Sequence, residues 1–259
     1  MNPTEYPNGN VVLTNENGIG TIEFFHPASN SLPRAILKLL AEAITAAGED
    51  DAIRVIVLKS SGDRAFCAGA SFDELTFISD EEIGKEFFMG FARVILAMRK
   101  APKFIIGRVQ GKTVGGGVGL ASSVEYCFAT KHASIKLSEL AIGIGPFVIG
   151  PAVQRKVGLS GMSQLAIDAT SWRTAEWAQN QGLFAQVFNT AEEMDQHVAV
   201  LAKKLAKSNS KAMEALKQSF WLGTENWENL LEERAAMSGA LVLSEFTKNA
   251  ISAFKTGQR

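Results

Sequence analysis

The chain has 259 residues, of which 46% are hydrophobic and 20% charged, and its formal net charge is −1. This length allows one large domain or a domain with an appendage, and the composition is typical of a soluble globular protein. The near-neutral charge gives no electrostatic reason to expect nucleic acid or an anionic membrane surface as a partner.

Cysteine spacing and the amino terminus exclude further classes of protein. Cys67 and Cys127 do not have the spacing of metal ligands, so we expect reduced thiols and no metal site. The amino terminus is polar, and no apolar run approaches membrane-spanning length. The sequence therefore predicts a cytoplasmic protein that binds neither membrane nor nucleic acid.

Up to about residue 100, short apolar strands alternate with helices. The predicted elements are strands over 11–14 and 20–25 joined as a hairpin, a helix after Ser31, a strand over 54–59, a small-residue loop over 60–75 and a helix over 80–99. Ser31 is the predicted N-cap of the first helix because Pro33 falls in its first turn.

The next strand, over 103–109, leads into a glycine-rich stretch, residues 110–121. Three consecutive glycines, Gly115 to Gly117, remove every Cβ where this strand turns into a helix. Another molecule can then approach the backbone closely, and the first amides of the helix stay unpaired and suit an anion. The alternative is a tight turn with close helix packing.

The rest of the chain divides in two near residue 190. The predicted elements are strands over 126–129 and 134–137, helices over 151–158, 160–169 and 175–181, and a strand over 183–188. From residue 191 only helices with large apolar residues are predicted. We therefore expect a parallel α/β core over 1–190 and a helical region over 191–259, which packs on its own domain or is buried between subunits.

The glycine-rich stretch fits neither a dinucleotide fingerprint nor a phosphate-binding loop. Two loops could each present a backbone amide, namely Ala68-Gly69-Ala70 and Gly115-Gly116-Gly117. Two amides that converge on one oxygen form an oxyanion hole, which stabilises an enolate or a tetrahedral intermediate.

Three motifs in this order resemble the enoyl-CoA hydratase/isomerase (crotonase) superfamily. They are Ala65-Phe-Cys-Ala-Gly-Ala-Ser-Phe-Asp-Glu-Leu, Val109-Gln-Gly-Lys-Thr-Val-Gly-Gly-Gly and the segment 134–145. The resemblance implies a crotonase-like spiral of ββα units followed by a helical trimerisation region, in a homotrimer or a dimer of trimers. It also implies an acyl-CoA substrate and no separate cofactor, since CoA is part of the substrate.

The resemblance also implies roles for individual residues. The amides of Ala70 and Gly116 would hold the thioester oxygen, and Glu139 matches a catalytic glutamate of the family. The remaining residues expected to contact the substrate are Ala28, Ser29, Ala68, Gly69, Gly115 and Gly119. Hydratases of the family commonly use two glutamates, but the position of the first one is Gly119 in this chain.

This departure bears on the reaction. Two carboxylates can divide the work of hydration, whereas one carboxylate suffices to remove a proton at one carbon and return it at another. Glu139 alone therefore favours isomerisation of an enoyl-CoA. The open alternatives are an enoyl-CoA hydratase, including a branched-chain, methylglutaconyl-type one, and a non-catalytic family member that binds CoA or RNA. Two variants follow: Gly116→Val, expected to keep the fold, and Gly119→Glu, expected to restore the second carboxylate.

Overall fold

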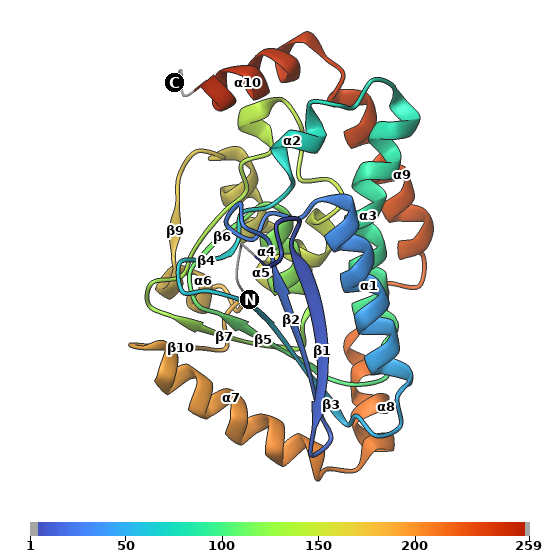
Figure 1. The fold of residues 1–259 in the computed structure, drawn as a ribbon, viewed down its shortest axis with the longest axis vertical. Coiled ribbons are helices and arrows are strands. Elements are labelled where there is room, and N and C mark those ends of the chain that lie inside the picture. The colour runs from blue at the N-terminus through green and yellow to red at the C-terminus, as the bar shows by residue number, and fades with distance from the viewer. Residues whose placement is uncertain (1–4, 257–259) are drawn as a thin grey trace.

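A computed structural model of the chain describes residues 5–256, apart from the side chains of residues 254–256 (Figure 1). Its strands form a six-stranded sheet with the order β1-β2-β3-β5-β7-β10 and a four-stranded sheet with the order β4-β6-β8-β9. The strands are β1 (Asn10–Glu16), β2 (Ile19–Phe25), β3 (Val55–Ser60), β4 (Ala65–Cys67), β5 (Ile105–Val109), β6 (Lys112–Val114), β7 (Tyr126–Thr130), β8 (Ser134–Lys136), β9 (Arg173–Thr174) and β10 (Gln186–Phe188).

Helices surround the two sheets. They are α1 (Arg34–Glu49), α2 (Phe72–Leu75), α3 (Glu81–Lys100), α4 (Gly116–Ser123), the 3₁₀ turn η1 (Leu140–Ile142), α5 (Gly150–Ile167), α6 (Ala175–Asn180), α7 (Ala191–Ala206), α8 (Ser210–Phe220), α9 (Trp227–Leu241) and α10 (Glu245–Thr256). None of the helices within the described residues is long and apolar enough to cross a membrane.

The large sheet confirms the predicted hairpin and the predicted parallel arrangement. Strands β1 and β2 pair antiparallel, and Asn17 and Gly18 turn the chain between them with φ of 54° and 82°. The other neighbouring strands of this sheet pair in parallel. The predicted end of strand formation near residue 190 is also confirmed, since the described residues after β10 form only helices.

One local prediction needs correction. The N-cap of α1 is Pro33 in an extended conformation, and Ser31 does not cap the helix. The Ser31 hydroxyl lies instead 2.9 Å from His26 Nδ1, because Ser31 belongs to the preceding loop. The prediction of two successive helices, over 151–158 and 160–169, is confirmed: non-helical backbone at Gly158, with φ of +70°, divides α5 into two helices, the second of which ends at Ile167.

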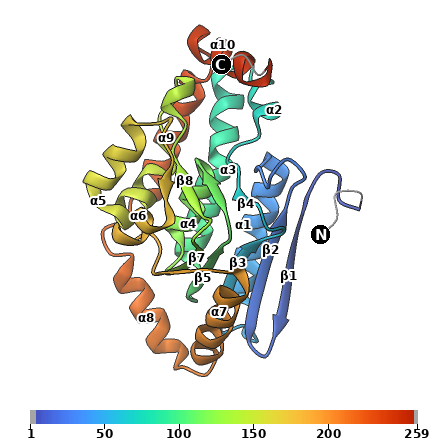
Figure 2. The same ribbon diagram turned by 90° about the vertical axis from the view of Figure 1, so that its left-hand side faces the viewer.

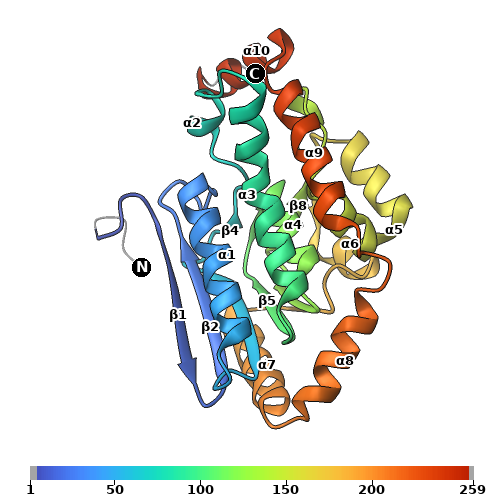
Figure 3. The same ribbon diagram turned by 90° about the vertical axis from the view of Figure 1, so that its right-hand side faces the viewer.

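The large sheet is buried on both faces. One face packs on α7 through a cluster that includes Val57, Ile106, Phe128 and Met194. The other face joins the main core beneath α1, α3 and α4. Figure 2 shows α7 beside the sheet, and Figure 3 shows α1 and α3 on its opposite side. Burial on both faces explains why the parallel strands are almost continuously apolar.

The helical region after residue 191 packs partly on the core of its own chain. Helix α9 lies along α3, as Figure 3 shows. The two backbones touch where Gly84 meets Gly239: a Cβ on Gly84 would lie 2.8 Å from the Gly239 Cα. Other large side chains of this region stay exposed, among them Leu222 (73%) and Phe246 (64%). The helical region therefore packs on its own domain through α9 and leaves other apolar side chains available for burial between subunits.

A buried ion pair joins α8 to the core. Lys217 Nζ lies 3.2 Å from Glu125 Oε2, and the two side chains are only 3% and 7% exposed. The ammonium also donates to the carbonyls of Met98 and Lys103, both at 2.8 Å. Glu125 accepts the Trp221 indole N–H and the Ile105 amide, so every strong polar group of this cluster is satisfied.

We expect Glu125→Gln to lower the free energy of unfolding by about 3 kcal/mol, because it leaves the Lys217 charge buried without its counter-charge. The control is Glu42→Gln, which removes an exposed pair with Lys38 at 3.9 Å and should cost less than about 1 kcal/mol. Urea unfolding followed by circular dichroism measures both. Equal losses in the two variants would show that the cluster does not anchor α8.

Candidate active site

Three neighbouring parallel strands of the small sheet end at one place. β4 leads to Ala68–Ala70, β6 leads to Gly115, and β8 leads to Glu139. The carboxyl ends of parallel strands lie on one edge of a sheet, so the two predicted amide loops and the predicted glutamate meet there. The sequence prediction treated residues 60–75 as a loop and missed β4, which has three residues and an irregular register with β6.

The Ala68–Ala70 loop is held by backbone contacts on two sides. The Ala68 amide donates to Ser29 O at 3.1 Å, and the Gly69 carbonyl accepts the Leu32 amide at 2.8 Å. Gly69 has φ of +88°, and a Cβ there would lie 3.0 Å from Val114 O and 3.8 Å from the Gly116 amide nitrogen. Glycine at this position therefore lets the loop lie directly against the Gly115–Gly117 turn.

Asn30 fastens this arrangement from within. Its side chain is 4% exposed and donates to the carbonyls of Ser61, at 2.8 Å, and Ala65, at 2.9 Å. Its Oδ1 accepts the His26 amide at 3.0 Å. The loop that contains Ala28 and Ser29 is thereby tied to both ends of the segment that precedes β4.

The Gly115–Gly117 turn leaves an amide available at the start of α4. The Gly115 carbonyl accepts the amides of Val118 and Gly119, so Gly116, the first helical residue, has no acceptor within the helix. Cβ atoms at Gly116 and Gly117 would collide with the Phe91 ring and the Cys67 side chain. The expectation that Gly116→Val keeps the fold is therefore wrong, because Phe91 is buried in α3.

Glu139 is the acidic group of the site. It precedes η1, and its carbonyl accepts the amides of Ile142 and Ile144. Its Oε1 packs against Gly115, since a Cβ on Gly115 would lie 2.7 Å from this oxygen. Its Oε2 is buried and has no hydrogen-bond partner among the described residues. Burial raises the pKa of the Glu139 carboxyl to about 7, since little in its surroundings stabilises the charged form.

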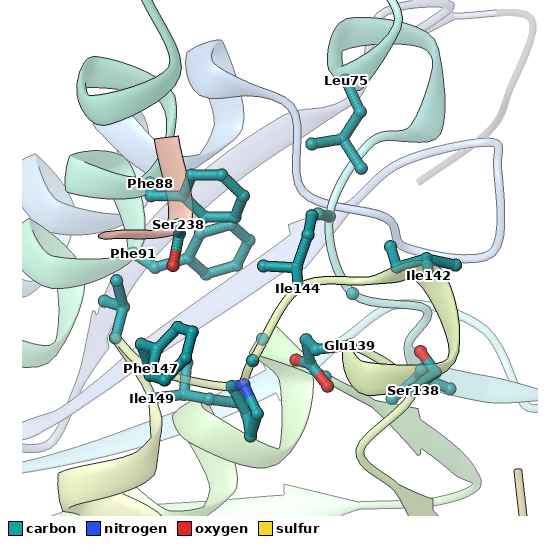
Figure 4. A pocket seen from close by; sticks show the side chains of 18 of the residues that line it. Leu75, Phe88, Phe91, Ser138, Glu139, Ile142, Ile144, Phe147, Ile149 and Ser238 are labelled. Carbon is teal, nitrogen blue, oxygen red and sulfur yellow. The ribbon is translucent and has the colours of Figure 1, made fainter. Parts of the chain in front are cut away.

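The carboxylate projects into a small apolar cavity of about 60 Å³ (Figure 4). The side chains that form most of its wall are Phe72, Leu75, Phe88, Phe91, Ile142, Ile144, Phe147 and Ile149. Two hydroxyls also line it, and one of them, Ser238 Oγ, already donates to the Arg234 carbonyl at 3.1 Å. Glu139 is the only titratable side chain among the described residues of this wall.

The structure brings together most of the predicted site residues. Ala68, Gly69, Ala70, Gly115, Gly116 and Glu139 all line the cavity. Gly119 does not line it, because Ile149 covers this position: a Cβ there would lie 2.6 Å from Ile149 Cγ2. Ala28 and Ser29 also lie outside the wall, behind the Ala68 loop.

Several wall residues were not identified from the sequence. Phe88, Phe91 and Ser238 come from α3 and α9, whose apolar patterns indicate only burial. Cys67 lies beside the site, but burial raises the pKa of its thiol to about 12, so it stays neutral. In the described part of the chain, no cluster of three His, Cys, Asp or Glu side chains could hold a metal ion.

The two sheets, the paired amide loops and the buried glutamate define a crotonase-type α/β fold, as predicted. A family model described as enoyl-CoA hydratase/isomerase matches residues 14–256, and the chain belongs to this family of enzymes.

Relatives of different activities resemble the chain. A short-chain-enoyl-CoA hydratase of Clostridium acetobutylicum is 26% identical over 248 residues, which are 95% of this chain and 94% of the relative. A peroxisomal Delta(3,5)-Delta(2,4)-dienoyl-CoA isomerase of Arabidopsis thaliana is 25% identical over 228 residues, or 82% and 80% of the two chains. The crystal structure of an enoyl-CoA hydratase from Bacillus halodurans matches with a TM-score of 0.86 and 21% identity, covering 94% of this chain and 99% of that one.

The raised pKa of Glu139 predicts a pH-dependent cost to folding. The unfolded carboxyl ionises near pH 4.5 and the folded one near pH 7, so the folded protein should lose stability as the pH rises between these values. Glu139→Gln removes this loss. Urea unfolding at pH 4.5 and pH 8 should show the variant gaining about 1–3 kcal/mol on the wild type at the higher pH. If the difference in free energy of unfolding between the variant and the wild type is the same at both pH values, Glu139 has the same pKa in the folded and unfolded protein.

Proposed function

We propose that this enzyme isomerises an enoyl-CoA by a 1,3-proton shift that Glu139 carries out alone. The observation that supports this most strongly is the buried, unpartnered Oε2 of Glu139 in a wall that offers no other titratable side chain among the described residues. A buried carboxyl with a perturbed pKa in an apolar cavity is typical of a catalytic acid or base.

The proposed reaction uses the carboxylate twice. Glu139 takes a proton from the carbon next to the thioester carbonyl, and the electrons move onto the thioester oxygen as a dienolate. The amides of Ala70 and Gly116 stabilise this oxygen by two hydrogen bonds. Protonated Glu139 then returns the proton to the carbon at the far end of the dienolate, which shifts the double bond. A pKa near 7 suits both steps, since the group must accept and release a proton at the same pH.

The apolar filling of the cavity argues against hydration. A hydratase must hold a water molecule against the double bond, and the family's hydratases commonly use a second glutamate for this. In this chain the matching position is Gly119, and Ile149 occupies the space where a side chain would begin. Hydration remains the alternative, since relatives of both activities resemble the chain.

A pocket larger than the catalytic cavity lies beside it and could hold the pantetheine arm of CoA. This outer pocket, of about 540 Å³, shares Ala68, Phe72, Val114, Ser138 and Ile142 with the catalytic cavity. Because Ala68 and Val114 adjoin the two amide loops, the outer pocket lies beside the place where a thioester held by Ala70 and Gly116 would sit. We therefore assign the outer pocket to the pantetheine arm, and the loop of Ala28 and Ser29 to supporting the Ala68 amide.

Glu139→Gln tests this proposal directly. The amide preserves size and polarity but cannot accept the proton, so isomerisation of a 3-enoyl-CoA should fall roughly 10²–10⁴-fold in kcat with little change in acyl-CoA affinity. Both isomerisation and hydration are followed by absorbance on the purified protein. Efficient hydration by the wild type, or isomerisation that survives Glu139→Gln, would overturn the one-glutamate mechanism.

A double variant provides the reverse test. Gly119→Glu alone should disrupt packing, because its Cβ would meet Ile149. Gly119→Glu with Ile149→Gly makes the space, and Ile149→Gly alone is the matched control. Only the double variant is expected to gain hydration, while isomerisation falls as a second carboxylate raises the pKa of Glu139.

We also propose that the chain assembles as a homotrimer or a dimer of trimers through its helical region. Large apolar side chains stay exposed there, namely Val200, Leu216, Phe220, Leu222, Met237, Leu241 and Phe246. Exposed apolar surface of this kind marks an interaction site. Light scattering should give the mass of three or six chains, and Leu216→Glu with Phe220→Glu should lower it. A wild-type monomer at low micromolar concentration would contradict this proposal.

A further inference from the structure

A second pocket lies behind one wall of the catalytic cavity. It encloses about 660 Å³ between α5 and α9 and shares Pro146 and Phe147 with the cavity. It has no lining residue in common with the outer pocket that we assign to the CoA arm. The catalytic cavity therefore stands between two pockets, and the second one is on the side that the acyl chain would reach.

The charge of this second pocket is positive. Its lining within the described residues includes Arg155 and Arg234 and no Asp or Glu. Arg155 is already engaged, since its guanidinium donates to the Phe220 carbonyl and lies 4.2 Å from the centre of the Trp221 ring. Arg234 forms no ion pair among the described residues, although it is only partly exposed.

Arg234 lies on α9 one turn from a residue that lines the catalytic cavity. Arg234 and Ser238 are four residues apart and so lie on one face of the helix. Ser238 lines the catalytic cavity, and Arg234 lines the second pocket one turn away. The Arg234 guanidinium carbon is 5.9 Å from the centre of the Phe147 ring. The Phe147 ring thus separates a partly buried cation from the apolar space around Glu139.

We propose that Arg234 binds a carboxylate at the far end of the acyl chain, so that the substrates are short-chain dicarboxylic acids carrying CoA at one end. This inference rests on the proposed function, since it places the thioester at Ala70 and Gly116. The acyl chain of the substrate passes Glu139. The Phe147 ring, which lines both pockets, changes its rotamer to let the acyl chain through, and the terminal carboxylate then pairs with the Arg234 guanidinium. A guanidinium can hold a carboxylate with two parallel hydrogen bonds, which neutral groups cannot match.

Alternative anions fit this location less well. A CoA phosphate is separated from the thioester by the long pantetheine arm, and the outer pocket is the one that adjoins the amide loops, since it shares Ala68 and Val114 with the catalytic cavity and the second pocket does not. Two acidic groups of α9 pair with lysines of α3, Glu232 with Lys85 at 2.7 Å and Glu228 with Lys100 at 2.5 Å, and the adjacent Glu233 forms no ion pair with Arg234 among the described residues. A carboxylate on the substrate is therefore the partner that the Arg234 guanidinium lacks.

Binding of two saturated thioesters tests this inference without requiring turnover. Adipoyl-CoA and hexanoyl-CoA have six-carbon chains that differ only at the end, as carboxylate or methyl. In calorimetric titrations, the wild type should bind adipoyl-CoA at least tenfold more tightly. Arg234→Gln should weaken adipoyl-CoA binding by about tenfold to a hundredfold, the effect of a lost charge-assisted hydrogen bond, and hexanoyl-CoA binding by less than about threefold. The affinity of Arg234→Lys for adipoyl-CoA should lie between those of the wild type and Arg234→Gln.

Arg155→Gln is the matched control, since Arg155 lines the same pocket but is engaged elsewhere. It should leave the ratio of the two dissociation constants unchanged. Equal affinity of the wild type for both thioesters, or a ratio unaltered by Arg234→Gln, would overturn the assignment of Arg234 even if isomerisation is found. A preserved preference for adipoyl-CoA in an enzyme that does not isomerise would refute the proposed reaction and keep the binding site.

Discussion

The packing of other elements against the bare backbone of α4 is the constraint on which the site depends. At Gly115, Gly116, Gly117 and Gly119, the space that a Cβ would take is filled by Glu139, Phe91, Cys67 and Ile149 in that order. These four side chains come from the loop after β8, from α3, from β4 and from the turn before α5. One short helix and its N-cap thereby set the positions of Glu139, the Gly116 amide and two walls of the cavity. Such interlocked packing leaves little freedom for any of them to move separately.

Two buried glutamates, Glu125 and Glu139, differ in the polar partners that surround their carboxylates. Glu125 meets an ammonium, an indole N–H and a backbone amide, so its charge is satisfied and ties β5, α4 and α8 together. Glu139 has no partner for Oε2 and its pKa rises to about 7. Burial of a charged group without hydrogen bonds is costly. The fold tolerates this cost only where the carboxyl faces a cavity, and there the same cost makes it a stronger base than an exposed glutamate.

How much the sequence predicts depends on the range of the interactions involved. The hairpin, the parallel strands and the helix boundaries near Gly158 and Gly182 follow from local patterns, and the structure agrees with them. The amide loops and Glu139 were found because their motifs are contiguous. Strands of three residues such as β4 and β6 leave almost no periodic signal. The contact of Ile149 with Gly119 and that of Phe91 with Gly116 join distant segments, so only the folded chain reveals them.

The small volume of the cavity affects the chemistry as well as the size of the substrate. In the proposed reaction, an acyl group that enters a space lined by Phe and Ile side chains would exclude water from Glu139 and lower the local polarity further. The ionised carboxylate would then lose more stabilisation than the neutral acid, so bound substrate would raise its basicity at the moment when the proposed mechanism requires deprotonation of a carbon acid. In the proposed reaction the oxyanion donors are backbone amides, one of them at the start of α4, and such fixed donors would stabilise a dienolate without reorganising. In this proposal the apolar walls strengthen the base that removes the proton, and the fixed amides stabilise the oxygen that receives the electrons.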